Sequence, residues 1–250
     1  MKKQVIILAA GGGTRLRSAS GGKHKSLMEV GHRRLIEYQM GILASVGIDS
    51  VCVVAGCCAG QVRSVVGDRA TYITNPDYSQ TNSLYSLWLA RDWVSGPFAL
   101  MNCDVLAHPD IYHRVLAVNG SALAYDSSSG SGEEEMKVAV EGGFVKALSK
   151  GLPKHQISGE NVGILQFDET ATELLFAEAA SLIALGNENQ WAPAAVSGIA
   201  SRVPIRAVDI AGLSWIEIDF PQDLERARRE ICPNIPGCSD RSLVEVRIAA

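Results

Sequence analysis

The chain has 250 residues, a formal net charge of −4 and 47% hydrophobic residues, enough for one α/β domain with an ample core. Lys and Arg do not gather into a basic stripe, and no apolar stretch approaches the length of a bilayer span, which argues against nucleic-acid and membrane partners. The apolar run at residues 5–10 is too short for a signal peptide, and we expect a cytoplasmic protein.

The first predicted element is a buried parallel strand over residues 5–10, which breaks into three glycines. Glycine brings bare backbone N–H groups close to a ligand, and two cations, Arg15 and Lys25, follow. N–H groups and cations together form a site for a polyphosphate. A Walker A loop does not fit because no Lys-Ser/Thr pair has its spacing, and a Rossmann fingerprint does not fit because Leu16 stands where its last glycine belongs.

The next elements alternate between helix and strand. Hydrophobic spacing predicts helices over 34–46, 61–66 and 83–94, and strands over 51–55, 70–74 and 98–102. This order predicts a Rossmann-like α/β fold with a doubly wound, mostly parallel sheet, whose ligands bind beyond the carboxyl ends of the strands.

The second half of the chain does not continue this alternation of helix and strand. A Ser/Gly-rich loop at 127–132 precedes a predicted β-hairpin with strands over 138–140 and 144–148. A helix over 170–185, strands over 205–209 and 215–219, and a last helix over 221–231 follow. We expect a single domain over residues 1–231, in which an inserted lobe at 125–200 carries the hairpin and builds an acceptor site, and a C-terminal tail at 232–250.

The six cysteines form no CxxC pair, and with the five histidines they give no zinc-ligand spacing. We therefore expect reduced thiols. Cys232 and Cys238 flank a Pro/Gly-rich segment and are candidates for a disulfide in vitro.

Two carboxylates follow predicted strands, Asp104 after 98–102 and Asp219 at the end of 215–219. A triphosphate needs a hard divalent cation, and Mg²⁺ takes one or two carboxylates while keeping water and phosphate oxygens as its other ligands. Each aspartate could instead be a helix N-cap, and Asp219, just before Pro221, is open to that alternative.

An ordered pattern at the N-terminus resembles the signature of the sugar-phosphate nucleotidyltransferase superfamily. It is filled by Gly11, Gly13, Thr14, Arg15, Leu16, Lys25, Leu27, Gly31, Leu35 and Ile36. The resemblance implies a GT-A-like nucleotidyltransferase fold, with Asp104 and Asp219 as the metal ligands. The superfamily usually has Pro before the lysine, where this chain has His24, so we expect Lys25 to be held less rigidly.

Later segments resemble the cytidylyltransferases that activate phosphocholine and aminoalkyl or hydroxyalkyl phosphonates. They lie at residues 75–87, 136–138, 149–150, 159–164 and 215–224, and the resemblance as a whole covers residues 3 to about 230. It implies transfer of CMP from CTP to a small acceptor of the phosphocholine, 2-aminoethylphosphonate or 2-hydroxyethylphosphonate type. Pyrophosphate would leave, and Mg²⁺, or Mn²⁺ in its place, would be the cofactor.

These patterns assign roles to particular residues. We expect Lys25 to contact the α-phosphate and Arg15 to hold the leaving pyrophosphate, as the catalytic pair. Polar groups before the helix at 83–94 could read cytosine, although Asn82 or Ser83 would also cap that helix. The expected nucleotide-binding residues are Leu8, Ala10, Gly11, Gly12, Gly13, Thr14, Thr81, Asn82 and Ser83.

Acceptor binding is expected from Lys137, Lys150 and Glu160, because lysines offset the repulsion between two phosphate anions. The two lysines could also be solvated residues beside the hairpin. A choline head group would need an aromatic or anionic cage, for which Tyr125, Phe144, Trp191 and Trp215 are available.

Two other functions stay open at this point. One is a nucleotidyltransferase that uses another nucleotide and a sugar or inositol phosphate. The other is a non-catalytic nucleotide-binding module, which the presence of Arg15, Lys25 and Asp104 disfavours. A monomer and a homodimer both fit the sequence.

Overall fold

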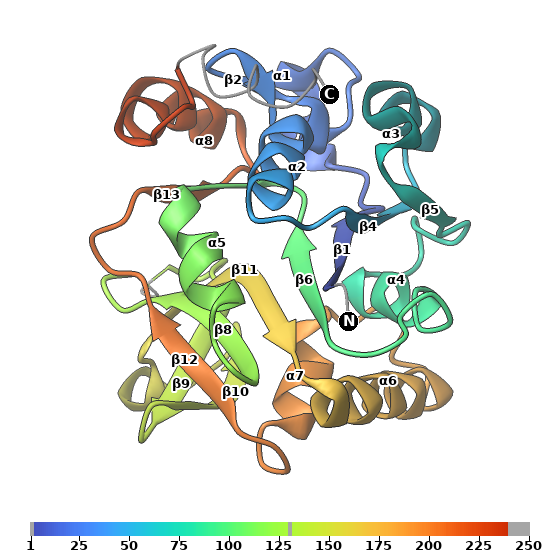
Figure 1. The fold of residues 1–250 in the computed structure, drawn as a ribbon, viewed down its shortest axis with the longest axis vertical. Helices are drawn as coiled ribbons and strands as arrows, with labels where there is room; N and C mark the ends of the chain where they lie inside the picture. The colour runs from blue at the N-terminus through green and yellow to red at the C-terminus, as the bar shows by residue number, and fades with distance from the viewer. Residues whose placement is uncertain (1–2, 130–131, 240–250) are drawn as a thin grey trace.

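The computed structural model describes residues 3–129 and 132–239, and within them nine strands form one sheet in the order β5-β4-β1-β6-β11-β8-β12-β10-β9 (Figure 1). The strands of this sheet are β1 (Gln4–Ala9), β4 (Ser50–Ala55), β5 (Thr71–Thr74), β6 (Phe98–Asn102), β8 (Ser121–Asp126), β9 (Lys137–Glu141), β10 (Phe144–Ser149), β11 (Gly159–Phe167) and β12 (Ile205–Asp209). Two small antiparallel pairs stand apart, β2 (Glu29–Val30) with β3 (Arg33–Arg34), and β7 (Val105–Ala107) with β13 (Trp215–Glu217).

The sheet confirms the predicted doubly wound α/β fold. Strands β5, β4, β1 and β6 are all parallel, as the alternation of helix and strand in the first half of the chain requires. The second half of the sheet is mixed, since β11 runs antiparallel to β6 and β8 while β12 runs parallel to β8. The predicted hairpin is β9–β10, and β9 also pairs with the start of β11, so this end of the sheet curls back on itself.

Helices cover both faces of the sheet. They are α1 (Arg17–Ser20), α2 (Leu35–Ser45), α3 (Ala59–Val66), α4 (Ser83–Leu89), α5 (Pro109–Leu116), α6 (Glu169–Ala184), α7 (Pro193–Ile199) and α8 (Pro221–Arg226). One hydrophobic core receives the apolar side chains of α2, α3, α5 and α8, and the other receives those of α4, α6 and α7.

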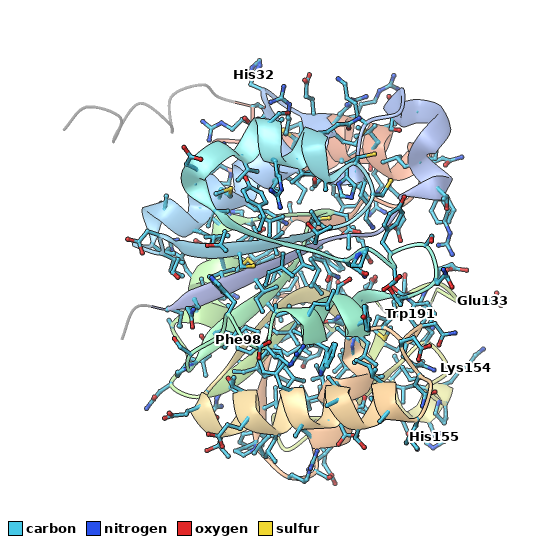
Figure 2. The ribbon with its side chains drawn as sticks, turned by 90° about the vertical axis from the view of Figure 1, so that its right-hand side faces the viewer. His32, Phe98, Glu133, Lys154, His155 and Trp191 are labelled. Atoms are coloured by element: carbon cyan, nitrogen blue, oxygen red, sulfur yellow. A yellow bond between two sulfur atoms is a disulfide. The ribbon has the colours of Figure 1, made fainter. Side chains whose placement is uncertain are left out.

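The sequence of β1 shows why both faces are filled. Val5 and Ile7 enter the first core, while Ile6 and Leu8 enter the second, because side chains alternate between the faces of a strand. A strand buried on both sides therefore reads as a continuous apolar run. In the second core, the ring of Phe98 stacks on the ring of Phe176 in α6, with centroids 5.5 Å apart. Phe98 lies inside the molecule, whereas Lys154 and His155 lie at its outer edge (Figure 2).

Several predicted boundaries are wrong. The helix predicted over 83–94 ends at Leu89, where the chain tightens into i→i+3 turns and the Arg91 guanidinium stacks over Trp88 and donates to its carbonyl. The end predicted for the last helix is confirmed, since α8 is α-helical to Arg226 and the chain continues as a π-helix to Ile231. The strand predicted over 215–219 ends at Glu217 and pairs with β7 outside the main sheet.

Cys232 and Cys238, the pair that the sequence offers as candidates for a disulfide, form one, with Cα atoms 5.4 Å apart. Gly31 packs directly against it, with a φ of +63°. Residues 130–131 of the Ser/Gly loop and 240–250 of the tail lie outside the described residues. In the part of the chain that is described, no helix is long and apolar enough to cross a membrane.

Candidate active site

The glycine loop leaves the carboxyl end of β1 and turns at Gly13, where φ is +53°. A side chain at this position would be strained, and its Cβ would lie 3.5 Å from the Cβ of Lys25. Glycine at position 13 therefore lets the loop pack closely against Lys25.

A cavity of roughly 360 Å³ opens beyond the carboxyl ends of β1, β5 and β6. It is lined by most of the residues assigned from the sequence, namely Leu8, Ala10, Gly11, Gly13, Thr14, Arg15, Lys25, Thr81, Asn82, Ser83, Asp104, Lys150 and Asp219. Gly12, Lys137 and Glu160 do not line it. The position matches the rule that ligands of doubly wound sheets bind at this edge.

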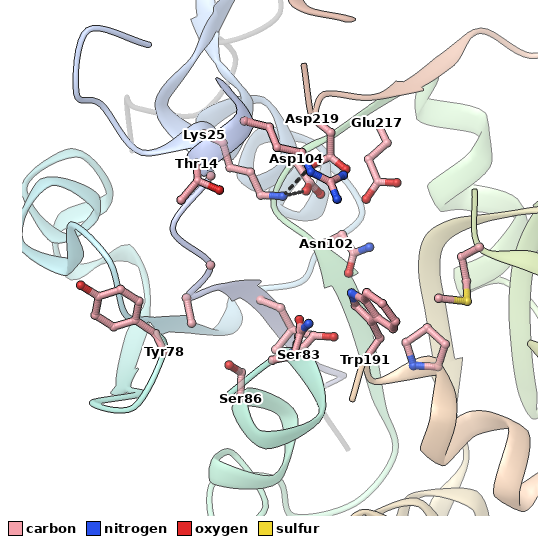
Figure 3. Close-up of a pocket in the computed structure, with 18 of the residues that line it drawn as sticks. Thr14, Lys25, Tyr78, Ser83, Ser86, Asn102, Asp104, Trp191, Glu217 and Asp219 are labelled. Carbon is pink, nitrogen blue, oxygen red and sulfur yellow. Dashed lines mark hydrogen bonds and ion pairs between the residues drawn. The ribbon is translucent and has the colours of Figure 1, made fainter. Parts of the chain in front are cut away.

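One end of the cavity is charged (Figure 3). The ammonium group of Lys25 contacts the carboxylate of Asp104 and lies 3.2 Å from Oδ1 of Asp219. Burial acts against the charged form of Lys25, but the two carboxylates outweigh it, and the pKa of Lys25 lies well above its ordinary value. Lys25 is therefore a fixed positive charge at any physiological pH.

The two aspartates meet because β7 pairs with β13. Glu217 lies opposite Val105, and the N–H of Ile218 donates to the carbonyl of Asp104 over 3.0 Å. The N-cap alternative does not hold for Asp219, because α8 begins after Phe220 and the carboxylate of Asp223 accepts from the N–H groups there. Asp104 lies in the turn between β6 and β7 rather than before a helix.

Glu217 joins this cluster and was not assigned from the sequence. Burial and the charges of Asp104 and Asp219 raise the pKa of its carboxyl group above the ordinary range. In the sequence, Glu217 stands two residues before Asp219. In the strand predicted over 215–219, this spacing would place the two carboxylates on the same side.

A second unassigned residue, Gln39 of α2, supports the turn that carries Asp104. Its fully buried side-chain amide donates to the carbonyls of Asn102 and Val105, over 2.8 and 3.0 Å. A glutamine among the apolar positions of an otherwise buried helix face is the feature that could have revealed it.

The aspartate pair fits a hard cation. Oδ1 of Asp104 is buried and has no hydrogen-bond partner among the described residues, which is costly for a carboxylate oxygen unless a ligand satisfies it. Across residues 3–129 and 132–239, no group of three or more His, Cys, Asp or Glu side chains is placed to hold a metal. Two carboxylates with water and phosphate oxygens are the ligand set that Mg²⁺ accepts.

The other end of the cavity is polar, with Ser83, Ser86 and Trp191 at its wall (Figure 3). Asn82 accepts from the N–H of Ser83 and so caps α4, as one reading of the sequence predicted. The amide of Asn75 donates to the hydroxyls of Thr81 and Ser86, both over 3.0 Å. These polar groups are held in place before any ligand arrives.

The rim of the cavity carries the remaining cations. Oε2 of Glu134 lies 3.2 Å from both Arg15 and Lys150, so one carboxylate joins the glycine loop to the hairpin. Lys150 also lies over the ring of Trp191, 5.0 Å from its centroid. Both cations face the space that a phosphate ligand would occupy.

Lys137 is not brought to the cavity. It is 6% exposed, and its ammonium group donates to the carbonyls of Lys150, Glu135 and Glu133 over 2.9, 3.3 and 3.5 Å. This geometry does not support a contact between Lys137 and the acceptor. The N–H groups of its ammonium group donate to backbone carbonyls instead, and they hold the hairpin to the loop before it.

A second cavity of about 580 Å³ adjoins the first and shares Glu134, Glu217 and Asp219 with it. Its wall is acidic and contains Glu160 and Asp126, and the indole of Trp215 donates to Asp126 over 2.9 Å. Burial raises the pKa of Glu160 to about 7, although the Ser129 hydroxyl donates a hydrogen bond to its carboxylate.

The chain combines this sheet topology with a glycine loop beside the cluster of Lys25, Asp104 and Asp219. These features place it among the nucleotidyltransferases. Residues 5–185 match the MobA-like NTP transferase domain, and the chain belongs to this family.

Named relatives agree with this assignment. The chain is 28% identical, over 96% of its length, to the bifunctional IPC transferase and DIPP synthase of Aquifex aeolicus, of which it covers 54%. It is 28% identical, over 92% of its length, to the CMP-5'-(3-aminopropyl)phosphonate synthase of Streptomyces rubellomurinus, of which it covers 39%. The chain thus spans about half or less of each of these relatives.

The solved structure of the CTP:phosphocholine cytidylyltransferase from Streptococcus pneumoniae has the same fold. It aligns with a TM-score of 0.74 and 20% identity, over 91% of this chain and 98% of that one. This similarity confirms the nucleotidyltransferase fold expected from the N-terminal signature.

Proposed function

We propose that this protein transfers CMP from CTP to a small phosphate or phosphonate acceptor with a positively charged head group, and releases pyrophosphate. The observation that carries the proposal is the Lys25–Asp104–Asp219 cluster at one end of a triphosphate-sized cavity, joined to a second, acidic cavity. Relatives whose names include cytidylyltransferase or CMP-phosphonate synthase support the choice of reaction.

In the proposed reaction, an oxygen of the acceptor attacks the α-phosphorus of CTP in line with the leaving pyrophosphate. The new oxygen–phosphorus bond forms as the bond to the β-phosphate oxygen breaks, and pyrophosphate departs with the electron pair. The acceptor is ionised at neutral pH, so no general base is required. Catalysis is then positioning and charge stabilisation.

Roles follow from the placement of the cations. Lys25, buried and always charged, would stabilise the α-phosphate as its charge redistributes. Arg15, with a half-exposed side chain at the rim, would hold the leaving pyrophosphate. The N–H groups of the glycine loop would bind the β- and γ-phosphates, and Thr81, Asn82 and Ser83 would read the base.

A divalent cation is part of the proposal. Asp104 and Asp219 would hold Mg²⁺ or Mn²⁺, which when bound would neutralise part of the triphosphate charge. The unsatisfied oxygen of Asp104 supports this placement.

The acceptor would enter from the lobe at residues 125–200. Lys150, which lines the first cavity, would bind the phosphoryl or phosphonyl oxygens. Glu160, Asp126 and Trp215 would surround the head group in the second cavity, where carboxylates and an indole favour an ammonium ion. A sugar or inositol phosphate offers this wall hydroxyl groups but no positive charge.

The test is a matrix of nucleotides and acceptors. Wild-type protein with Mg²⁺ is incubated with CTP, UTP, GTP or ATP, and with phosphocholine, 2-aminoethylphosphonate, 2-hydroxyethylphosphonate, inositol phosphate or glucose 1-phosphate, and pyrophosphate release is measured. The Asp104→Asn variant is the control. Turnover restricted to CTP and an acceptor with a positively charged head group is the expected result, and turnover only with glucose 1-phosphate contradicts it.

A further inference from the structure

His24 occupies the position before Lys25 and is 2% exposed. Its Nε2 lies 3.0 Å from the carbonyl oxygen of Gly11, in the glycine loop. Its Nδ1 accepts from the N–H of Ser26 over 3.2 Å and lies 2.8 Å from the Ser26 hydroxyl. One imidazole ring therefore contacts both the loop before Lys25 and the turn that carries it.

The hydrogen bonds fix the form of the ring. A backbone N–H can only donate, so Nδ1 must be unprotonated to accept from Ser26. In the neutral ring Nε2 then carries the proton and donates it to the Gly11 carbonyl, which can only accept. The burial of His24 lowers the pKa of its ring and favours the same neutral form.

From these contacts we propose that His24 is a positioning residue. It holds the glycine loop and the turn of Lys25 in one fixed arrangement, which we call the lock. In this arrangement the N–H groups of the loop and the ammonium group of Lys25 face the same triphosphate. His24 does not line the cavity and touches no reacting group. The proposal rests on the proposed function for the identity of the ligand, but the lock itself is a property of the free protein.

The loop needs such a lock because it consists of glycine. Three consecutive glycines have more backbone freedom to lose than any other tripeptide, and nothing lies within 4 Å of where a Cβ on Gly11 would stand. A hydrogen bond from a rigid, buried ring restrains the Gly11 carbonyl directly. Gln61 of α3 restrains the backbone of His24, since its Oε1 accepts from the backbone N–H of His24 over 3.2 Å and its amide donates to the carbonyl of Gly22.

A proline before the lysine would act differently. It would restrict the backbone of its own residue, but it would have no N–H for Gln61 and no side-chain donor for Gly11. The ring of His24 thus restrains the loop through its side chain, whereas weaker restraint of Lys25 in the absence of proline remains a prediction.

Two isosteric substitutions separate the two ring nitrogens. In His24→Gln the amide nitrogen can replace Nε2 and donate to Gly11, while the contact to Ser26 is lost. In His24→Asn the amide oxygen can replace Nδ1 and accept from Ser26, while the contact to Gly11 is lost. His24→Ala loses both contacts.

The first measurement is amide hydrogen exchange of residues 8–16 in the free protein. We expect faster exchange in His24→Asn and His24→Ala, and rates close to wild type in His24→Gln. Equal exchange in the Asn and Gln variants overturns the lock. This readout needs no ligand, so it stands even if the proposed reaction fails.

The second measurement is the dissociation constant of CTP with Mg²⁺, together with kcat and the KM of the acceptor. Loss of one hydrogen bond predicts CTP binding weakened about 3- to 10-fold in His24→Asn, with the acceptor KM unchanged and binding restored in His24→Gln. Weakened acceptor KM with unchanged CTP binding contradicts the inference. Absence of CTP binding by the wild type would instead contradict the proposed function.

Discussion

The ammonium group of Lys25 contacts the carboxylate of Asp104, a side chain that is 5% exposed. The two residues belong to segments far apart in the chain, one after the glycine loop and the other after β6. The carboxylate of Asp104 stabilises the charged form of Lys25, so a substitution at one residue changes the environment of both.

Lys25→Ala should lower kcat by at least ~10²-fold, the scale of losing one donor that stabilises developing charge. It should also destabilise the fold, because it leaves the buried Asp104 without its partner. Adding Asp104→Asn to Lys25→Ala should recover stability but not activity. Pyrophosphate release and thermal unfolding of wild type and the two variants measure this, and a Lys25→Ala enzyme within about threefold of wild type would contradict the assignment.

Activity should be lost in EDTA and return with Mg²⁺ or Mn²⁺, because Asp104 and Asp219 supply the two carboxylates that such a cation needs. Asp104→Asn and Asp219→Asn should each raise the concentration of Mg²⁺ needed for half-maximal rate. Asp168→Asn, which changes a carboxylate that caps α6 and does not line the cavity, is the control and should leave that concentration unchanged. Full turnover in EDTA would rule out the metal site.

CTP should be preferred to UTP by at least tenfold in kcat/KM. A site whose polar groups satisfy the exocyclic amine of cytosine leaves some of them unpaired against the carbonyl of uracil. The groups at this end of the cavity are already held by Asn75, so they cannot readily rearrange to suit another base. Equal kcat/KM values for the two nucleotides would assign the protein to a different substrate group.

Lys150→Ala and Lys137→Ala should have opposite consequences. Lys150 faces the first cavity, so its loss should raise the KM of the acceptor several-fold with little effect on stability. Lys137 is buried with three carbonyl partners, so its loss should lower the melting temperature and leave the KM of the acceptor nearly unchanged. The same acceptor KM in wild type and Lys150→Ala would exclude Lys150 from acceptor binding.

The stability of the protein should depend on the ionisation of Glu160. Its pKa is raised to about 7 in the folded protein and is ordinary when unfolded, so the folded state binds more protons between these values. The free energy of unfolding therefore falls as pH rises through the folded pKa. Glu160→Gln removes this penalty and should be more stable relative to wild type at pH 8 than at pH 5, by at most about 3 kcal/mol. Urea unfolding at both pH values tests this, and a difference that does not change with pH would contradict it.

The sequence predicted the parallel half of the fold well because its signals are local. Buried strands such as 98–102 are continuous apolar runs between loops, and the helices between them repeat at 3.6 residues. It did not predict β8 or β11. Both lie in the mixed half of the sheet, where pairing depends on partners distant in the chain.

The candidate site shows the same limit. Glycine, Arg15, Lys25 and the strand-end aspartates were recognisable because their chemistry is visible residue by residue. The roles of Gln39 and Glu217 depend on what they touch, which only the packing of α2 and the β7–β13 pair determines. The sequence did not reveal that Lys137 is buried. A lysine beside a hairpin is expected to be exposed as long as its carbonyl partners are not known.

Strand β11 runs through both regions of the molecule. All nine of its residues are buried, and it pairs with β6, β8 and β9, so one continuous strand joins the nucleotide half to the acceptor lobe. This strand connects the two regions and carries an irregularity between Asn161 and Leu165, where Gly163 has a φ of +76°. Evolution of a new acceptor preference would then proceed by changing surface loops, at positions such as 127–129 and 132–136, while the sheet beneath the first cavity stays the same.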